Sequence, residues 1–551
     1  MAGLLPRSPS YEECYRDFRW QIPKHFNIAT AVCDRHAAAR PDDVAIIFEG
    51  EGGQTERMSF GRLQSEANRL ANVLQTLGVA KGDRVAIHLP QSFEAAVTHI
   101  AAYKLGAIAL PLFSLFGPDA LRHRLVDSSA QVLMTCAANL SVLDGIRGDL
   151  GDLRQVLVTD AATDCYLDAR QLMAASSDQF ETLQTQADDA AMLIYTSGTT
   201  GDPKGALHGH RVLLGHMPGV EFPHRYFPEA DDVFWTPADW AWAGGLLDVL
   251  LPSLFHGRPV LAKRFAKFEP DAVFQLMAKH KVRNTFMPAT ALRMLRQHPD
   301  PARFDVNLRS IASGGEALGE DLIGWGRETF GLTINEFYGQ TEVNLVVGNN
   351  ADVMEVKPGS MGRPIPGHEV SVIDNVGNEV AAGEIGVMAV KRPDPVMFLE
   401  YWNNPEATAN KFIGDWCVLG DLGWRDDDGY LWFKSRDDDV IISSSYRIGP
   451  TEVEECLVAH PKVAMAGVIG SPDPVRGEVV KAYVVLAEGV SADDQVHDDI
   501  QAFVKSQLSA HEYPRQLRFI DALPLTVTGK IQRMKLRELD KAEARACSNQ
   551  I

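Results

Sequence analysis

The segment Tyr195–Gly205, YTSGTTGDPKG, has the composition of a phosphate-binding loop and directly follows the apolar run AAMLI. Its glycines let backbone N–H groups approach a polyphosphate, and its hydroxyl groups can donate to phosphate oxygens. Lys204 adds a positive point charge. The spacing differs from GxxxxGKS and GxxxxGKT, so the segment is not the P-loop of kinases and GTPases. A plain surface linker rarely needs a Thr-Thr pair and a lysine among its glycines. We therefore predict that this loop binds a polyphosphate.

Five further motifs combine glycine, hydroxyl, carboxylate and basic side chains. They are SGGEALG (313–319), FYGQTE (337–342), LGDLG (419–423), SRDDDVIISSSYRIGPTEVE (435–454) and PLTVTGKIQR (524–533). In this order, the six segments resemble the signature motifs of the adenylate-forming superfamily, and FYGQTE, SSSYRIGP and PADWAWAGG look most like medium-chain acyl-CoA synthetases and their bacterial relatives. The resemblance implies that a carboxylate attacks the α-phosphate of ATP, releases pyrophosphate and then passes its acyl group to coenzyme A.

The resemblance also assigns the nucleotide site to individual residues. Thr341 would contact the α-phosphate, and Glu342 would bind Mg²⁺, for which a carboxylate beside phosphate oxygens is the expected ligand. Tyr338 would stack on adenine, Asp421 would accept both ribose hydroxyls, and Arg436 would reach the ribose and phosphate. The other residues implied in ATP or AMP binding are Thr196, Ser197, Gly198, Thr199, Thr200, Gly201, Lys204, Gly314, Gly315, Glu316, Glu336, Phe337, Gly339 and Gln340, with Thr199 as a second metal contact.

The resemblance implies that two C-terminal motifs serve the same active site one after the other, first for adenylation and then for thioester formation. Lys530 matches a mobile lysine that bridges the substrate carboxylate and the α-phosphate, where its charge would offset the repulsion of two anions. Together with Thr341 and Glu342 it would form the catalytic set. Asp438 matches a hinge about which a small domain rotates between the two half-reactions. The rotated domain would bring the coenzyme A-binding residues Ser444, Ser445, Tyr446 and Arg447 to the pantetheine tunnel.

Two positions depart from the family pattern. Leu419 stands where a threonine usually precedes the Gly-Asp pair, although Asp421 itself is present. Ser445 replaces a glycine that would let pantetheine pass close to the backbone. An alternative to coenzyme A ligation therefore stays open at this point, namely a free-standing adenylation enzyme that loads a carrier protein.

One position in the motif FYGQTE concerns the acid. Acetate-specific relatives typically carry a tryptophan just before QTE, whereas this chain has Gly339. Losing an indole opens volume, so we expect an acid larger than acetate: medium-chain, branched-chain or aromatic. Trp240, Trp242 and Gly244 fall in the segment that lines the acyl pocket in the group this chain resembles, although a tryptophan pair in an apolar stretch is as often part of the core.

The elements that position these residues alternate between strand and helix patterns. RVAIHL (84–89) predicts a buried strand, FEAAVTHIAAYKLGA (93–107) a helix ending on glycine, and IALPLF (108–113) a second strand. This order predicts βαβ units with largely parallel sheets. After about residue 360, glycine-punctuated strands predict an antiparallel or barrel-like region. We predict an α/β fold with a large AMP-binding domain (1–437) and a small, mobile α+β domain (438–551).

Composition limits the partners and the compartment. The formal net charge of −20 argues against nucleic-acid binding. The seven cysteines form no CxxC pair and suit a reducing compartment. No secretory signal and no membrane-spanning run is visible, so we expect a cytoplasmic enzyme whose partners are a small carboxylic acid, ATP and coenzyme A, with an unknown oligomeric state. The nearby histidines lack zinc-site spacing, so we interpret them as structural or channel-lining: His208, His210, His216 and His224.

Overall fold

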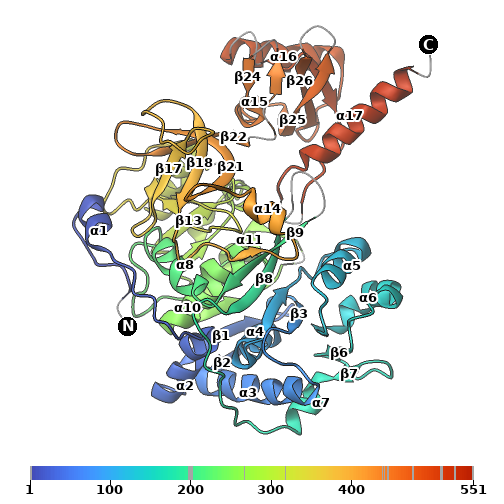
Figure 1. The fold of residues 1–551 in the computed structure, drawn as a ribbon. Helices are drawn as coiled ribbons and strands as arrows, with labels where there is room; N and C mark the ends of the chain where they lie inside the picture. The colour runs from blue at the N-terminus through green and yellow to red at the C-terminus, as the bar shows by residue number, and fades with distance from the viewer. Residues whose placement is uncertain are drawn as a thin grey trace. The chain divides into compact units, whose positions relative to one another are not determined.

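The computed structural model divides into two compact units, and each is described by itself. The first comprises residues 1–197, 203–370 and 390–417, and the second comprises 198–202, 371–389 and 418–551. The elements are labelled in Figure 1. The structure describes residues 3–196, 203–265, 267–316, 318–436, 439, 441–443, 446–473, 477–508, 513–526 and 529–548.

The predicted strand–helix–strand unit lies at the centre of an eight-stranded sheet in the first unit. β3 (Arg84–His88) and β4 (Ile108–Pro111) pair in parallel, and α4 (Phe93–Leu105) connects them. Ser92 caps the start of α4, and Gly106, at φ +67°, ends it in the left-handed conformation that glycine adopts readily. The strand order is β19-β9-β8-β4-β3-β5-β6-β7. The other strands are β5 (Val132–Thr135), β6 (Gln155–Val158), β7 (Leu167–Asp168), β8 (Ala190–Thr196), β9 (Lys204–Gly209) and β19 (Glu400–Tyr401).

A nine-stranded sheet forms the rest of the first unit's framework, in the order β16-β15-β14-β13-β12-β10-β11-β1-β2. Its six central strands are parallel, and antiparallel strands lie at both ends. This confirms the predicted α/β class. The strands are β1 (Val44–Glu49), β2 (Thr55–Ser59), β10 (Phe234–Trp235), β11 (Val260–Ala262), β12 (Asn284–Phe286), β13 (Ser310–Gly314), β14 (Asn335–Tyr338), β15 (Val347–Gly348) and β16 (Arg363–Pro364).

Helices follow most of the parallel strands, as βαβ connections require. Their apolar faces supply the core residues that pack between helices and sheets. The longer ones are α1 (Tyr11–Asp17), α3 (Phe60–Thr76), α5 (Pro118–Asp127), α6 (Leu140–Ile146), α8 (Val212–Glu221), α11 (Pro270–Lys279), α12 (Ala289–Arg296) and α13 (Glu320–Phe330). The short helical segments are η1 (Thr30–Asp34), α2 (Arg35–Ala39), η2 (Ala137–Asn139), η3 (Arg147–Asp149), α7 (Ala169–Ala174), α9 (Ala243–Gly245), η4 (Leu246–Leu250), α10 (Leu251–His256), η5 (Pro301–Arg303) and α14 (Pro405–Ala409).

The region after residue 360 is built from short strands, as its glycine punctuation predicted. They form a five-stranded sheet in the order β17-β18-β21-β20, with β22 paired to β21. The pairs of β21 with β20 and β22 are antiparallel. The strands are β17 (Val370–Ile373), β18 (Gly386–Lys391), β20 (Phe412–Ile413), β21 (Trp416–Arg425) and β22 (Leu431–Arg436).

The C-terminal region of the second unit has its own sheet and core. Its strand order is β24-β23-β26-β25, with β27 added in parallel to β26. Two helices that the sequence predicted, at 451–460 and 493–508, are present as α15 (Pro450–Val458) and α16 (Asp494–Gln507). The remaining elements are β23 (Ile441–Ser443), β24 (Tyr446–Ile448), β25 (Val463–Asp473), β26 (Gly477–Leu486), β27 (Gln516–Phe519) and α17 (Arg533–Ser548).

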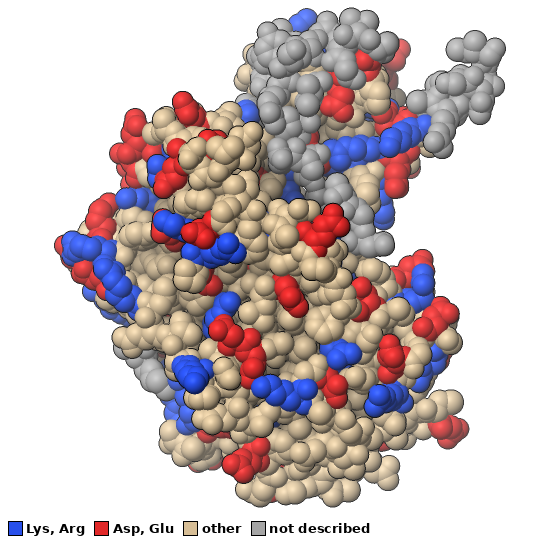
Figure 2. Space-filling model, viewed as in Figure 1, with Lys and Arg blue, Asp and Glu red and all other residues tan. Residues whose placement is uncertain are grey.

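Charged side chains are dispersed over the face of the molecule shown in Figure 2. Acidic and basic groups alternate there among uncharged ones, so the net charge of −20 is not gathered into one patch on that face. Within the described ranges, no helix combines the length and the apolar character that a bilayer crossing requires.

Candidate active site

The residues predicted to border adenine meet at the carboxyl edge of the nine-stranded sheet. β13 ends at Gly314 and β14 at Tyr338, and the two strands pair in parallel with Gly314 opposite Phe337. A Cβ atom on Gly314 would lie 2.4 Å from the Phe337 ring, so glycine alone fits. Gly315 has φ +85°, which also favours glycine. Ligands of parallel α/β sheets bind beyond this edge, so the two motifs lie together where such a fold can bind a nucleotide.

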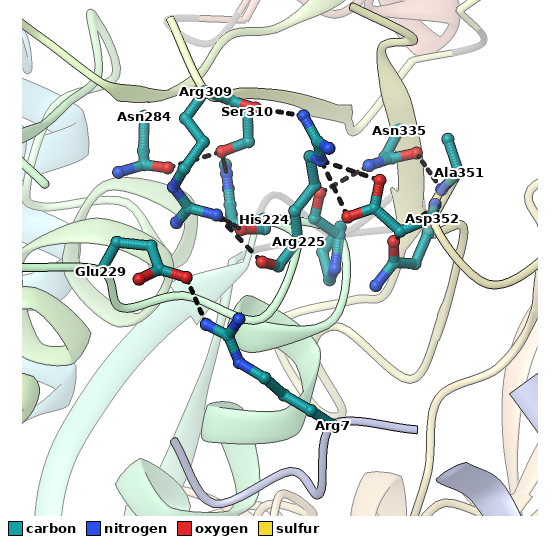
Figure 3. Close-up of polar contacts among 12 residues, drawn as sticks. Arg7, His224, Arg225, Glu229, Asn284, Arg309, Ser310, Asn335, Ala351 and Asp352 are labelled. Carbon is teal, nitrogen blue, oxygen red and sulfur yellow. Dashed lines mark hydrogen bonds and ion pairs between the residues drawn. The ribbon is translucent and has the colours of Figure 1, made fainter. Parts of the chain in front are cut away.

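The opposite edge of the same strands is closed by side chains (Figure 3). Asn284, Ser310 and Asn335 are the first residues of β12, β13 and β14. The Ser310 hydroxyl donates to Asn284 Oδ1 at 2.7 Å and lies 2.8 Å from His224 Nδ1, while Ala351 N–H donates to Asn335 Oδ1 at 3.1 Å. These hydrogen bonds join the starts of the three strands to one another or to the segments at His224 and Ala351, which contributes rigidity at this edge. Ion pairs around it are Arg225–Asp352, Arg309–Asp232 and Arg7–Glu229.

Three other members of the predicted nucleotide set have protein partners or are buried. Glu316 Oε2 accepts a hydrogen bond from the Thr290 hydroxyl at 2.7 Å and lies 3.4 Å from Arg293. Glu336 and Phe337 are buried in β14. The predicted nucleotide set therefore contains two kinds of residue. Some lie at the carboxyl edge of the sheet, and others are buried beneath it or bonded to neighbouring side chains.

A tight turn follows Tyr338 and carries Gly339, Gln340 and Thr341. Gln340 N–H donates to the Val343 carbonyl at 3.0 Å, and Val343 N–H donates back to the Gln340 carbonyl at 3.2 Å. The turn therefore presents the Thr341 side chain, which is half-buried, beside the carboxyl edge of β14.

The space beside Gly339 is filled, contrary to the expectation that a missing indole opens volume there. A Cβ atom at residue 339 would lie 2.2 Å from the Leu345 nitrogen and 2.7 Å from the Asn344 Cα. Leu345 has φ +55°, and Asn344 Nδ2 donates to the buried Asp248 Oδ1 at 2.7 Å. Burial raises the pKa of Asp248 well above its usual range. The backbone at 344–345 therefore occupies the place in which volume was expected.

The predicted phosphate loop connects β8 and β9. Thr196 and Lys204 stand opposite each other where these antiparallel strands end. The intervening predicted residues Ser197, Gly198, Thr199, Thr200 and Gly201 lie outside the described part of the chain. The strand pair fixes the two ends of the loop at neighbouring positions, as a polyphosphate cradle requires.

The base of this loop is held by α5 and by the chain after β19. The Tyr195 hydroxyl donates to Asp127 Oδ2 at 2.5 Å, and His123 Nε2 lies 2.9 Å from the Pro203 carbonyl oxygen. Trp402 Nε1 donates to the Asp127 carbonyl at 3.1 Å. Both strands that lead into the loop are thus fixed by neighbours distant in sequence.

Glu342, the predicted metal ligand, is a buried carboxylate on the same unit as Lys204. The Tyr401 hydroxyl donates to Glu342 Oε1, and Lys204 Nζ lies 5.6 Å from the centroid of the Tyr401 ring. Mg²⁺ bound with ATP usually takes one or two carboxylates and completes its shell with phosphate oxygens and water. One buried carboxylate near a lysine fits that pattern. No group of three His, Cys, Asp or Glu that could hold a metal alone occurs among the described residues.

In the second unit, the predicted ribose-binding residues lie side by side. Asp421 and Arg436 are cross-strand partners on β21 and β22, with Arg436 Nε 3.2 Å from Asp421 Oδ1. Asp421 is buried, and the arginine neutralises its charge there. An ionised carboxylate held in this way can accept two hydroxyl donors.

The predicted catalytic lysine lies on a short hydrogen-bonded turn. Thr526 N–H donates to the Lys530 carbonyl at 2.7 Å, and Lys530 N–H donates to the Thr526 hydroxyl at 3.0 Å. The Lys530 side chain is exposed. Immediately afterwards, Arg533 pairs with Asp439 at 3.1 Å and Glu454 at 2.6 Å, which ties the turn to the core of the C-terminal region.

The predicted hinge and coenzyme A residues lie partly within the described part of the chain. Asp438, Ser444 and Ser445 lie outside the described residues. Tyr446 and Arg447 belong to β24, of which the backbone is described.

Comparison with known proteins decides the family. The AMP-binding enzyme model matches residues 33–402, and the model of the AMP-binding enzyme C-terminal domain matches 452–530. The chain belongs to the AMP-binding enzyme family. Acetyl-coenzyme A synthetase of Bacillus subtilis (strain 168) is 37% identical over 96% of this chain and 94% of its own length. Acyl-coenzyme A synthetase ACSM3, mitochondrial, of Homo sapiens is 33% identical over 96% of this chain and 92% of its own.

The similarity extends to solved structures. The anthranilate CoA ligase AuaEII in complex with anthranoyl-AMP has a TM-score of 0.86 at 28% identity, covering 95% of this chain and 99% of that one. This AMP-binding enzyme is an ATP-dependent, AMP-forming acyl-CoA ligase, as the six motifs predicted. It uses ATP with Mg²⁺ and coenzyme A.

Among the residues predicted to line the acyl pocket of this AMP-binding enzyme, Trp242 is half-buried, whereas Trp240 and Gly244 are buried. Trp242 packs on Phe286 with ring centroids 5.6 Å apart, and Phe286 packs on Phe337 at 5.1 Å. A Cβ atom on Gly244 would lie 2.8 Å from the Phe286 ring. Trp240 is buried in the same apolar core, to which Phe286 and Phe337 also belong and against which Trp242 packs. We call Trp242, Phe286 and Phe337 the aromatic row; it reaches the carboxyl edge of β12 and β14.

The four histidines of the AMP-binding enzyme are buried at separate positions. His210 Nδ1 accepts the Ile28 N–H at 3.2 Å, and His216 Nδ1 donates to the Val212 carbonyl at 2.8 Å. Burial lowers the pKa of His208 to about 3 and that of His210 and His216 to about 4. Burial likewise lowers the pKa of His224, beside Ser310, to about 3. All four are therefore neutral at physiological pH.

Motif analysis of this AMP-binding enzyme missed Phe286, Asp248 and Tyr401. Phe286 ends a parallel strand, so the strand-end rule that grouped the other residues would have found it. Asp248 and Tyr401 give no such signal, because their partners lie 96 and 59 positions away in the sequence.

Proposed function

We propose that this acyl-CoA synthetase activates an acid larger than acetate: a medium-chain, branched-chain or aromatic acid. The observation that carries this proposal is the half-buried Trp242 at the end of the aromatic row: its ring is tilted against the buried Phe286 ring, and its remaining apolar face suits an acyl group. Gly339 adds no volume of its own. The similar proteins differ in what their names state, from acetyl to anthranilate, so the acid must be argued from residues.

We also propose residue roles for the first half-reaction. The acid's carboxylate oxygen forms a bond to the α-phosphorus of ATP, and the bond from that phosphorus to the bridging oxygen of pyrophosphate breaks. The side chains of Lys530 and Thr341 would act at the α-phosphate, and Glu342 would hold the Mg²⁺ that accompanies ATP. Lys204 and the 197–201 loop would bind the β- and γ-phosphates. Catalysis of this kind is positioning and charge neutralisation, which needs no protein nucleophile.

The adenine and ribose contacts complete the proposed site. Gly314, Gly315, Glu316 and Tyr338 would surround adenine. The ribose would be bound by Asp421 and Arg436, and coenzyme A by the residues of 444–447. We further propose a boundary between residues 437 and 438, with Asp438 as the hinge, and a cytoplasmic location, which the scattered cysteines support.

A second candidate function rests on Ser445, which stands in place of a glycine along the proposed pantetheine path. In that case the enzyme would form the acyl-adenylate and load a carrier protein.

A pyrophosphate-release screen over acids from C2 to C10, including branched and aromatic ones, tests the proposed acid. We expect kcat/KM to rise from acetate toward a larger acid. Each methylene that the pocket accommodates should stabilise the transition state by ~1–3 kcal/mol. An optimum at acetate would contradict the proposal. Thiol consumption is followed in parallel, and acyl-AMP formation without loss of coenzyme A thiol would favour carrier loading.

A further inference from the structure

The short strand β19 runs beside β9 and fixes Tyr401 next to the turn that carries Glu342. Tyr401 stands opposite Ala206 in this antiparallel pair. On either side of it, the N–H groups of Leu399 and Trp402 both donate to β9 carbonyls at 2.7 Å. Main-chain hydrogen bonds therefore determine where the phenol lies, and Tyr401 as a whole residue is 6% exposed.

The segment that contains Tyr401 holds Glu342 at two points. The Tyr401 hydroxyl donates to Glu342 Oε1, and Phe398 N–H donates to the Glu342 carbonyl at 2.8 Å. An ionised carboxylate can only accept hydrogen bonds, so the phenol is the donor. Side chain and main chain of Glu342 are thus both oriented from one strand.

The Glu342 carboxylate is left with charge to be compensated. Glu342 as a whole residue is 7% exposed, and within the described ranges the phenol is the hydrogen-bond partner of the carboxylate, through Oε1. One neutral donor does not offset the loss of hydration of a buried anion, which normally requires a cation or further donors. A divalent cation would supply that compensation, and a carboxylate fixed by a hydrogen bond binds a metal better than a rotating one.

We infer that Tyr401 is a positioning residue for Mg²⁺·ATP: its hydroxyl orients the Glu342 carboxylate toward the cation. This inference rests on the metal-binding role proposed for Glu342. Losing such a hydrogen-bonded partner of a metal ligand typically weakens metal binding about 10- to 100-fold.

The ring of Tyr401 makes a separate contact that the test must preserve. Lys204 Nζ lies 5.6 Å from the ring centroid, within the range of a cation–π interaction. Tyr401→Phe keeps this contact and removes only the hydroxyl, so it separates the orientation of Glu342 from the placement of Lys204.

The experiment titrates Mg²⁺ against full-length wild type and Tyr401→Phe at saturating ATP and acid. We expect the Mg²⁺ concentration for half-maximal pyrophosphate release to rise about 10-fold or more, with the maximal rate largely recovered at high Mg²⁺. Binding of Mn²⁺ with a non-hydrolysable ATP analogue, followed by electron paramagnetic resonance, provides a readout independent of turnover. It should weaken by a similar factor.

Tyr103→Phe is the matched control. Tyr103 is a fully buried tyrosine on α4 whose hydroxyl lies 3.1 Å from His99 Nδ1. Removing this hydroxyl should leave the Mg²⁺ and Mn²⁺ titrations unchanged, even where the melting temperature falls.

Glu342→Gln separates failure of the inference from failure of the proposed function. If Glu342→Gln shifts the metal titrations and Tyr401→Phe does not, the positioning role of Tyr401 is wrong and the proposed site stands. If neither variant shifts them, the metal-binding role of Glu342 is wrong, and the inference is overturned with it. A lower melting temperature of Tyr401→Phe with an unchanged Mn²⁺ affinity would assign the hydroxyl to stability alone.

Discussion

Asp239 is a half-buried carboxylate three residues before Trp242 of the aromatic row. Its Oδ1 accepts the Ala241 N–H at 2.8 Å, and burial raises its pKa to about 6. A folded-state pKa above the unfolded value means that the folded protein binds the proton more tightly. The contribution to stability is therefore complete below about pH 4 and is lost as the pH rises through about 6.

Asp239→Asn should accordingly stabilise the protein more at neutral pH than in acid. From the pKa difference, we expect the gain in the free energy of unfolding to grow by about 1 kcal/mol between pH 5 and pH 7.5. Urea unfolding at both pH values measures it. Asp305→Asn, at an exposed aspartate, is the control. A gain that is equal at both pH values would contradict the assignment.

At the residue scale, local motifs indicated which residues lie together, while the role of each residue stays a prediction. The residues of FYGQTE and SGGEALG lie at one sheet edge, because both motifs end parallel strands. Residue-level prediction failed at Gly339, where a Cβ atom would meet the backbone of Asn344 and Leu345. That close approach depends on the left-handed φ of Leu345, which no propensity assigns to leucine.

At the scale of elements, the phosphate loop depends on helix α5 for its base. The Tyr195 hydroxyl reaches Asp127 at the C-terminal end of that helix. Lys204 lies opposite Thr196, one residue after Tyr195, so movement of β8 would displace the proposed phosphate contact.

Tyr195→Phe should raise the KM for ATP about 3- to 10-fold, which corresponds to one hydrogen bond of ~1 kcal/mol. Steady-state pyrophosphate release at varied ATP measures the change. Tyr166→Phe removes a similar tyrosine–aspartate contact, with Asp144, at an exposed position. We expect it to leave the KM unaltered. If both substitutions raised the KM for ATP equally, the Tyr195–Asp127 hydrogen bond would have no specific effect on ATP binding.

The order of these elements was readable from periodicity, since β3, α4 and β4 occur where alternating strand and helix patterns predicted them. The pairing of β19 with β9, however, could not be predicted from periodicity. β19 has two residues and lies almost two hundred positions from its partner, so its pairing follows from tertiary structure alone.

At the scale of the whole molecule, the proposed roles are distributed over two units. Glu342 and Lys204 belong to the first unit, while Asp421, Arg436 and Lys530 belong to the second. If Lys530 serves adenylation and the 444–447 region serves thioester formation, the two half-reactions should respond separately to substitutions.

Lys530→Ala should slow acyl-AMP formation by about 10²- to 10³-fold, the usual loss for one charged group at a developing anion. It should leave the reaction of preformed acyl-AMP with coenzyme A within a few-fold of wild type. Single-turnover assays of each half-reaction measure the two rates. Lys535→Ala, at an exposed lysine on α17, should change neither. An equal loss of rate in both half-reactions would contradict the proposal that Lys530 acts in adenylation alone.

The nine-stranded sheet has one edge closed by mutual hydrogen bonds among Asn284, Ser310 and their neighbours, and an opposite edge that carries the glycines and the aromatic row. This arrangement separates side chains that join the strand starts from those proposed to contact the acid. A library randomised at the half-buried Trp242 should therefore yield many folded variants, with new acid preferences if the proposed acyl pocket is correct. The same diversity at residues 284 and 310 should yield mostly insoluble protein.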